Sequence, residues 1–229
     1  MIVAIFRPKE YAKETEEKLR RFGFDVVSTP MIELREKTVR VRDADYTIIT
    51  SRTSAEIALK KGLIRGRIIT IGPKTAEPLK SYNVLIPSKY DSATLYREFA
   101  DLLKNKRVNL LRSDKGSGIL LNLSEICDLR EYQLYEIVKI KNDSTRRIVR
   151  EIAEKRVDAA VFSSRMIVES FMENAEDIGI LKKVVKSLNE IKTIAIGPPT
   201  KEKLSEYGVD ALMPEKYDFD GVIELLSSI

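Results

Sequence analysis

The sequence predicts an α/β protein in which parallel strands are covered by helices on both faces. Short apolar runs bounded by Gly, Pro or Asp alternate with amphipathic stretches along nearly the whole chain, which is the pattern of such a layered sheet. Hydrophobic residues make up 43% of the 229 residues, enough to build real cores. A chain of this length suits two domains of about 110 residues each better than one.

The predicted elements follow one another in a regular order. The apolar run at residues 2–6 predicts a buried strand, and the amphipathic stretch at 9–22 predicts the helix after it. Further strands are expected at 24–28, 46–50, 67–71, 83–86, 107–111, 134–140, 158–162, 192–196 and 209–213. Further helices are expected at 53–61, 74–81, 92–104, 117–125, 144–155, 165–175, 180–189, 199–206 and 219–228. Nearly every strand is therefore followed by a helix.

The composition excludes several kinds of chemistry. The chain has no histidine and one cysteine, Cys127. The absence of histidine rules out Ser-His-Asp triads, Cys–His pairs and His-ligated zinc or haem. One cysteine cannot form a disulfide within the chain or a Cys-rich metal site. Any chemistry must therefore rest on carboxylates, Tyr, Lys, Arg, hydroxyls and backbone amides, and we expect no metal site and no cofactor.

We expect a cytoplasmic protein that does not enter a membrane. No apolar run approaches the ~20 residues that a membrane span needs. Residues 1–8 lack the charged leader of a signal peptide and resemble a first strand instead. A single cysteine also suits a reducing compartment.

The balance of charge leaves two interpretations open. The net charge is +5, from 40 basic and 35 acidic residues. A well-solvated surface explains this value, and so does a polyanionic ligand. Charge alone does not distinguish a nucleic acid from a small polycarboxylate, although the chain lacks basic clusters interleaved with aromatic residues, which argues against nucleic acid.

An internal repeat is the most informative feature of the sequence. Three segments recur in the same order and with similar spacing, apart from extra residues around 176–190. They are Ile-Ile-Thr-Ser-Arg at 48–52 and Val-Phe-Ser-Ser-Arg at 161–165, Ile-Thr-Ile-Gly-Pro-Lys-Thr at 69–75 and Ile-Ala-Ile-Gly-Pro-Pro-Thr at 194–200, and Pro-Ser-Lys-Tyr-Asp at 87–91 and Pro-Glu-Lys-Tyr-Asp at 214–218. Three ordered matches indicate duplication.

A weaker repeat involves the remaining halves of the chain. Residues 5–7 resemble 110–112, and the stretch ending at 32–34 resembles 135–137. The chain therefore consists of four segments in the order a, b, a′, b′, where a and a′ contain residues 5–34 and 110–137, and b and b′ contain the three repeated segments at 48–91 and 161–218. If the two middle segments, b and a′, form one sheet, then the two outer segments, a and b′, must form the other. The predicted organisation is a first domain from 1–34 plus 142–229, an inserted second domain at 38–133, and linker strands at 29–40 and 132–143 that could pair as an antiparallel ribbon.

The repeated segments lie where ligands bind in open parallel sheets, beyond the carboxyl ends of the strands. The hydroxyls and guanidinium groups there suit anions, as do amides at helix starts, although Ser and Thr at these positions also serve simply as helix caps. Neither glycine turn is a nucleotide-binding fingerprint. The candidate substrate-binding residues are Arg7, Thr50, Ser51, Arg52, Gly72, Lys74, Thr75, Arg112, Ser113, Ser163, Ser164, Arg165, Gly197 and Thr200.

These motifs together resemble the uroporphyrinogen-III synthase family. That family has a strand ending in a Thr-Ser or Ser-rich turn, then an Ile-Gly-Pro-x-Thr strand, turn and helix, and both recur in its second domain. The matching segments here are 49–51, 71–76, 162–164 and 195–200, with 110–112 and 134–135 as further similar features. The resemblance spans essentially the whole chain.

The resemblance implies two flavodoxin-like domains, each a parallel sheet with helices on both faces, joined by a two-stranded β linker, with the ligand between them. It implies the substrate hydroxymethylbilane, a linear polycarboxylate that loses its terminal hydroxyl, inverts its last pyrrole ring and closes to uroporphyrinogen III, a step of haem and sirohaem biosynthesis. It implies a cofactor-free lyase, which we expect to be a monomer that could receive its substrate from the preceding enzyme.

Family precedent also assigns roles to residues. In the family, a tyrosine of the linker is placed as a proton donor near the departing hydroxyl, and the matching position here is Tyr135. The alternative interpretation is that Tyr135 only packs its ring against the linker and forms a local hydrogen bond. Thr75, Thr200, Ser51 and Ser163 match binding positions of the family.

One position departs from the family pattern. Pro199 stands where the family often has a second Thr, and it has no N–H for a carboxylate, which leaves Gly197 and Thr200 at this turn.

The alternative function is that of a two-lobed binding or regulatory module that closes on a small polyanionic ligand. Duplicated α/β lobes with a hinge are as consistent with such a module as with an enzyme.

Overall fold

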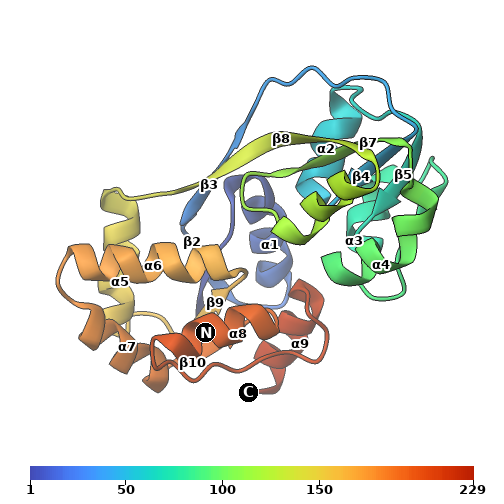
Figure 1. The fold of residues 1–229 in the computed structure, drawn as a ribbon. Helices are drawn as coiled ribbons and strands as arrows, with labels where there is room; N and C mark the ends of the chain where they lie inside the picture. The colour runs from blue at the N-terminus through green and yellow to red at the C-terminus, as the bar shows by residue number, and fades with distance from the viewer. The chain divides into compact units, whose positions relative to one another are not determined.

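The computed structural model describes residues 1–229 and shows two compact units (Figure 1). Unit 1 comprises Met1–Glu33 and Val138–Ile229, and unit 2 comprises Leu34–Ile137. Each unit has its own mixture of parallel strands and helices. The α/β class predicted from the alternating apolar runs is confirmed.

The sheet of unit 1 has four strands in the order β10-β9-β1-β2. Their bounds are Lys192–Ala195 for β10, Ala159–Phe162 for β9, Ile2–Phe6 for β1 and Asp25–Ser28 for β2. All three neighbouring pairs are parallel. The strand expected at 209–213 is reduced to a single parallel bridge between Ile194 and Leu212, and Pro214 follows closely with no N–H to extend the ladder.

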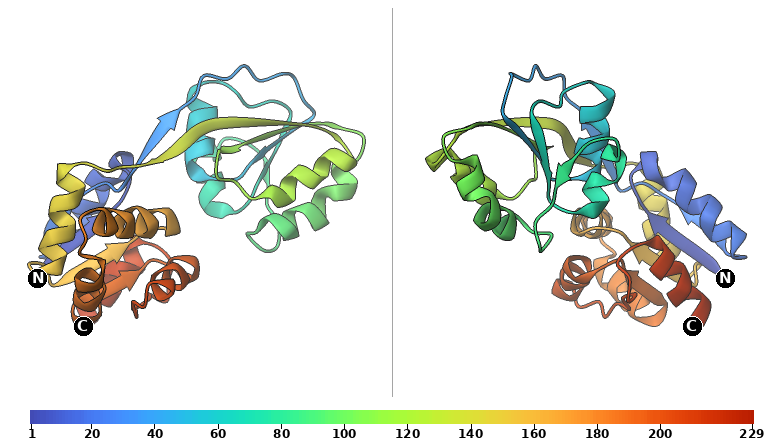
Figure 2. Two further views of the ribbon diagram at one scale, coloured as in Figure 1. Left: turned by 60° about the vertical axis from the view of Figure 1, so that its left-hand side comes forward. Right: turned by 90° about the vertical axis from the view of Figure 1, so that its right-hand side faces the viewer.

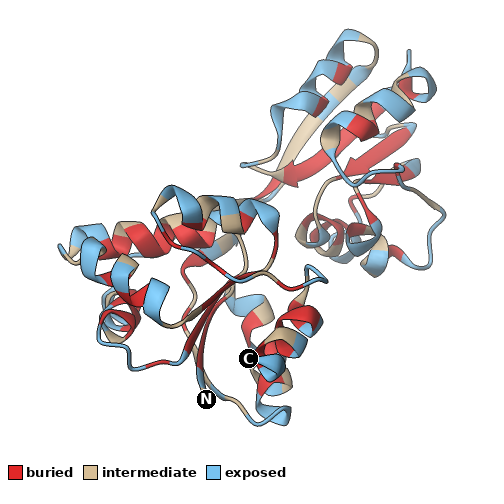
Figure 3. Ribbon diagram, turned by 90° about the horizontal axis from the view of Figure 1, so that it is seen from below, coloured by how far each residue is buried: buried red, intermediate tan, exposed pale blue.

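Helices cover both faces of this sheet. They are α1 (Lys9–Arg21), α5 (Asp143–Ala153), α6 (Arg165–Asp177), α7 (Leu181–Glu190), α8 (Pro198–Glu206) and α9 (Phe219–Ser228). Alternate strand residues such as Val3 and Val161 form a core with Leu19 of α1 and Val222 of α9. Figure 3 shows the buried strands of this unit enclosed by helices whose outer faces are exposed.

The opposite face of the same sheet holds an aromatic cluster. The rings of Phe6 and Phe162 lie 4.9 Å apart, and Phe171 of α6 lies 5.1 and 5.2 Å from them. All three side chains are fully buried. Because successive strand residues point to opposite faces, Phe6 packs on α6 while its neighbour Ile5 belongs to the core on the α1 face.

Unit 2 contains the longer sheet, in the order β3-β8-β7-β4-β5-β6. The bounds are Ile32–Glu36 for β3, Asp128–Lys139 for β8, Arg107–Ser113 for β7, Tyr46–Ile49 for β4, Arg67–Thr70 for β5 and Val84–Leu85 for β6. From β8 to β6 every neighbouring pair is parallel.

The helices of unit 2 also pack on both faces of its sheet. They are α2 (Arg52–Lys60), α3 (Pro73–Ala76) and α4 (Ser92–Leu103), with 3₁₀ turns at Glu77–Leu79 and Gly118–Glu125. Ile49 and Leu111 pack with α2, whereas Ile48 and Leu110 pack with Leu95 of α4 on the other face. The helices expected at 74–81 and 117–125 are thus partly or wholly 3₁₀.

Strands β3 and β8 are neighbours in the sheet, and both cross the residue boundaries of the units (Figure 2). Lys37 N–H donates to Leu134 O (2.7 Å), and Ile140 N–H donates to Met31 O (2.9 Å). The residue number rises along β3 as the number of its partner in β8 falls, so the two strands run antiparallel. β8 begins at Asp128, earlier than the expected 134, because its first half pairs with β7.

The two sheets have the same plan. With β7 and β8 as counterparts of β1 and β2, and β4 and β5 as counterparts of β9 and β10, the strand orders coincide. The two outer segments of the chain thus form one sheet, and the middle segments form the other. No helix combines the length and the apolar character needed to cross a membrane.

We predict that Phe171→Ala lowers the free energy of unfolding by about 3–5 kcal/mol, because it leaves a cavity in the aromatic cluster. Urea denaturation followed by circular dichroism measures this loss. Phe22→Ala is the matched control, since Phe22 is 59% exposed and its removal should change stability by less than about 0.5 kcal/mol. Equal losses in the two variants would contradict the assignment of Phe171 to the core.

Candidate active site

The strand register of unit 1 gathers three turns at one edge of its sheet. Phe6 pairs with Phe162, which pairs with Ala195, so the three parallel strands end side by side. The residues that follow are Arg7, the Ser163–Ser164 pair and the glycine turn at Gly197. The carboxyl edge of this sheet therefore carries every site residue predicted in unit 1.

Unit 2 repeats the arrangement. Ile49 pairs with Leu111 and with Thr70, so Thr50 and the glycine turn at Gly72 lie at the same edge. The predicted candidates of unit 2 at this edge are Thr50, Ser51, Arg52, Gly72, Lys74 and Thr75, which follow β4 and β5, and Arg112 and Ser113, which are the last two residues of β7. Strand β8 adds Tyr135, which pairs with Ser113 next to a β-bulge.

Ser51 and Ser164 act as helix caps. Ser51 Oγ accepts a hydrogen bond from Ser54 N–H at 3.0 Å, and Ser164 Oγ accepts one from Ile167 N–H at 3.3 Å. Ser163 lies one residue earlier and donates to the carbonyl of Phe6 at 2.7 Å, which ties β9 to β1. Capping and bracing thus account for part of the duplicated serine motif.

Tyr135 is joined to the serine turn of unit 2. Its hydroxyl lies 3.1 Å from Ser51 Oγ, and either group can donate. The ring belongs to the core of unit 2 and is 5% exposed. Tyr135 therefore both packs in the core and forms a local hydrogen bond. Its hydroxyl, the group that would donate a proton, is hydrogen-bonded to Ser51, the N-cap residue of α2.

The two glycine turns have the same backbone. Gly72 (φ −178°) and Gly197 (φ −173°) are both extended, a conformation open to any residue. Thr75 and Thr200 each donate their N–H to the carbonyl of that glycine at 3.1 Å. Because Pro199 has no N–H, the sequence pointed to the Thr200 amide as a possible donor to a ligand carboxylate. In the structure this amide is already hydrogen-bonded within the turn. The Thr side chains, 5% and 4% exposed, supply the hydroxyl groups at this edge.

Arg112 is largely buried and holds a loop together. Its Nε lies 2.6 Å from Glu131 Oε1, and its Nη1 donates to the carbonyl of Ser117. A Cβ built on Gly116 would lie 2.6 Å from the Arg112 side chain. The small-residue turn after β7 therefore wraps around this guanidinium, and Gly116 is required because Arg112 occupies the space of a side chain.

Two of the other predicted cations, Arg7 and Arg52, have side-chain partners within the protein. Arg7 donates to Thr15 Oγ1 at 2.5 Å and stacks over the Phe219 ring at 4.3 Å. Arg52 pairs with Glu56 (2.8 Å) and Glu77 (3.2 Å). Lys74 and Arg165 are exposed. Exposed pairs are weak and exchange readily for a ligand carboxylate.

A pocket of about 450 Å³ opens at the carboxyl edge in unit 1. It is lined by Ser163, Ser164, Arg165, Met166, Ile196, Gly197, Pro198, Pro199, Thr200 and Tyr217. Another pocket, of about 420 Å³, lies at the amino ends of the strands near Met1 and Lys192, away from the duplicated turns. The position of the pocket at the carboxyl edge, beside the duplicated serine and glycine turns, therefore makes it the candidate site.

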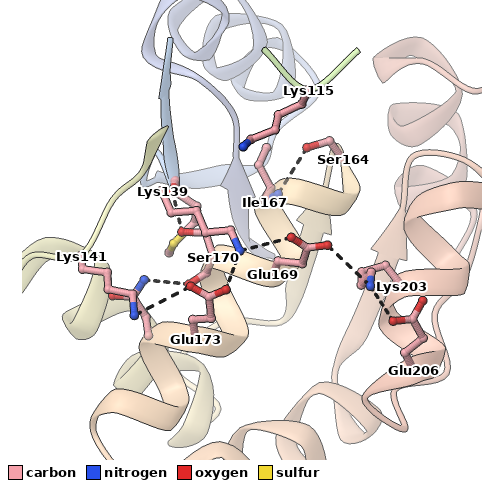
Figure 4. A network of polar contacts seen from close by, with 12 residues as sticks. Lys115, Lys139, Lys141, Ser164, Ile167, Glu169, Ser170, Glu173, Lys203 and Glu206 are labelled. Carbon is pink, nitrogen blue, oxygen red and sulfur yellow. Dashed lines mark hydrogen bonds and ion pairs between the residues drawn. The ribbon is translucent and has the colours of Figure 1, made fainter. Parts of the chain in front are cut away.

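An ion-pair network joins α6 and α8, the two helices whose first residues line this pocket (Figure 4). Glu169 of α6 lies 3.2 Å from Lys139 of β8 and 3.5 Å from Lys203 of α8. Glu173 also pairs with Lys139. Burial lowers the pKa of Lys139, but its carboxylate partners outweigh this effect and hold the pKa above its ordinary value. Glu169 thus connects the end of β8 with the two helices that start at the serine and glycine turns.

No three His, Cys, Asp or Glu side chains are grouped so as to hold a metal ion. Sequence reasoning did not select Tyr217, which lines the pocket at the end of a repeated motif. That repetition was the available signal. Sequence reasoning also missed Glu169 and Lys203, because no local sequence pattern marks a contact between two helices.

Comparison with known proteins points to one family. The family model described as uroporphyrinogen-III synthase HemD matches residues 13–224. A protein of Archaeoglobus fulgidus, provisionally named a uroporphyrinogen-III synthase, is 44% identical over 228 residues, covering 100% of this chain and 99% of that protein.

Two solved structures show the same fold. A mutant uroporphyrinogen III synthase from the extremely thermophilic bacterium Thermus thermophilus aligns with a TM-score of 0.66 at 18% identity, covering 100% of this chain and 98% of that one. The uroporphyrinogen-III synthetase from Helicobacter pylori aligns with a TM-score of 0.62 at 16% identity, covering 100% and 99%.

We predict that Glu169→Gln lowers the free energy of unfolding by about 1 kcal/mol, because it removes one charge from two partly buried ion pairs. Thermal unfolding at low salt measures this. Glu151→Gln is the control, since Glu151 pairs on one helix with Arg147, which is 81% exposed, and should lose about 0.3 kcal/mol. Losses of the same size would contradict a bracing role for Glu169.

Proposed function

We infer that this chain, which belongs to the uroporphyrinogen-III synthase family, converts hydroxymethylbilane to uroporphyrinogen III in porphyrin biosynthesis. It is a cyclising lyase. The family reaction removes the terminal hydroxyl, inverts the last pyrrole ring and closes the macrocycle. The observation that carries the inference is the duplicated set of hydroxyl-bearing turns at the carboxyl edge of both sheets, in a chain that matches the family along nearly its whole length.

We propose that each unit is a flavodoxin-like domain and that β3 and β8 are the linker between them. The strand order β2-β1-β9-β10 and its counterpart β8-β7-β4-β5 support this assignment, because flavodoxin-like sheets follow the order 2-1-3-4-5. The antiparallel hydrogen bonds of β3 with β8 support the linker. The corresponding domain limits are 1–34 with 142–229 for one domain and 38–133 for the other.

We propose that both units bind carboxylates of the bilane. Thr200 lines the pocket of unit 1, and Thr75 occupies the same position in unit 2. Arg52 and Arg165 at the helix starts supply charge that can transfer to a ligand. Holding one folded conformation of a reactive substrate is work of proximity and orientation, and needs no histidine, metal or cofactor.

Tyr135 is the proposed proton donor to the departing hydroxyl. The Ser51 hydroxyl, 3.1 Å away, can accept from Tyr135 in the resting state or donate to it after the proton has left. Ser51 is in turn positioned by Ser54, whose N–H it accepts. The cap of α2 thus fixes the direction of the phenol group. We also propose a cytoplasmic monomer that takes its substrate from the preceding enzyme.

The product isomer ratio tests the activity. Supplied with hydroxymethylbilane, the protein should raise the ratio of type III to type I uroporphyrinogen, measured by chromatography after oxidation to porphyrins. The unaided substrate closes to the uninverted type I isomer. A module that only binds the polyanion would leave the ratio at the spontaneous value, and that result would remove the enzymatic assignment.

We predict that Tyr135→Phe slows formation of the type III isomer by about 10²-fold or more, because a general acid contributes rate enhancements of that order. Initial rates at saturating substrate measure this. Tyr82→Phe is the control, since Tyr82 is 44% exposed and lies outside both glycine turns. Turnover of Tyr135→Phe equal to that of the control would exclude Tyr135 as the proton donor.

A further inference from the structure

We propose that Tyr90 and Tyr217 are ring contacts for the pyrroles of the substrate, one in each unit. The proposal deepens the function proposed above and rests on it. The ligand chemistry is an electron-rich aromatic ring that carries carboxylate side chains. Neither tyrosine lies on a strand or a helix, and both occupy the fourth position of the repeated segments at 87–91 and 214–218.

Each ring lies against the glycine of its unit's turn. A Cβ built on Gly72 would be 3.1 Å from Tyr90 Cβ and Cγ, and one on Gly197 would be 3.5 Å from the same atoms of Tyr217. Since both glycines have extended backbones, φ does not explain their presence. The close approach of a tyrosine offers a reason at Gly72, where an added Cβ would push Tyr90 away by a few tenths of an ångström. At Gly197 the same contact is an ordinary van der Waals distance.

The backbone that carries each ring is anchored at the next residue. Asp91 caps α4 by accepting from Thr94 N–H at 2.7 Å, and Asp218 caps α9 by accepting from Gly221 N–H at 3.0 Å. The tyrosine is thus held between a helix cap and a glycine. An aromatic ring fixed in this way loses little conformational entropy when a ligand stacks on it.

Both rings remain largely exposed in spite of these contacts. Tyr90 is 65% exposed and Tyr217 is 51% exposed. A single exposed aromatic residue needs no explanation. Two at equivalent positions, each beside the turn that carries a buried threonine, are better explained by a common ligand.

The pocket of unit 1 shows what the ring would meet. Tyr217 lines it together with Ile196, Pro198 and Thr200. A pyrrole placed there would stack on or against the phenol ring while its acetate or propionate reaches the threonine hydroxyl group. The ring face, rather than the phenol oxygen, is the binding element, so phenylalanine should replace either tyrosine.

Kinetics of leucine and phenylalanine variants test the proposal. Tyr217→Leu and Tyr90→Leu should each raise KM for hydroxymethylbilane about three- to tenfold, as expected for the loss of one aromatic contact. Tyr217→Phe and Tyr90→Phe should stay within about twofold of the unmodified protein, because the ring face is kept. Tyr82→Leu is the control and should not change KM, because that exposed tyrosine lies outside the repeat.

Two results would overturn the proposal. One is a KM for both leucine variants that equals that of the unmodified protein. The other is an equal rise for phenylalanine and leucine, which would assign the effect to the phenol oxygen. Absence of the type III product with the unmodified protein would instead overturn the proposed function, so the two failures are distinguishable.

A second measurement avoids any folding defect in the variants. The unmodified protein, labelled with ¹³C-tyrosine, is titrated anaerobically with uroporphyrinogen III and followed by NMR, with the phenylalanine variants assigning the signals. Ring signals of Tyr90 and Tyr217 should shift on binding, and that of Tyr82 should not. Unmoved signals at saturating ligand would contradict the proposal.

Discussion

Parallel pairing between distant segments is the constraint on which the rest of the structure depends. Phe6 must lie beside Phe162, and Ile49 beside Leu111, before any turn can meet another. Helices cover both faces of each sheet, so the central strands are mainly apolar on both sides, and the few polar side chains inside them, such as Thr47 and Asn109, are hydrogen-bonded. In each unit the carboxyl edge is where the duplicated hydroxyl groups and an exposed tyrosine gather.

Much of the polarity at this edge is used to build it. The serines cap helices, the threonine amides close the glycine turns, and Arg112 fills the loop after β7 by pairing with Glu131. What remains for a polyanion is hydroxyl groups, exposed guanidinium groups in exchangeable pairs, and ring faces. Such a site is suited to holding a flexible substrate in one shape, and the family reaction requires this because the bilane is reactive without help.

In unit 1, ion pairs connect the two helices that begin at the serine turn and at the glycine turn. Glu169 joins Lys139, at the end of β8, to α6 and α8, so the helices that begin after Ser164 and Gly197 share one brace. Ion pairs of this kind contribute only about 1 kcal/mol to stability. We expect them to matter chiefly by fixing the positions of the two turns, since a displacement of about 1 Å can cost much of the rate.

The sequence by itself determined the α/β class, the duplication, the absence of histidine chemistry and the family, because these follow from local periodicity, composition and ordered motifs. It also located the turns, since Gly-Pro and Ser-Arg follow apolar runs. Only the tertiary structure decided the partners. Arg112 meets Glu131 and Tyr135 meets Ser51, which is 84 residues away. Residues 209–213 contribute one bridge instead of a strand. Such outcomes depend on strand register and on competition among side chains for the same neighbour, and a linear pattern does not encode either one.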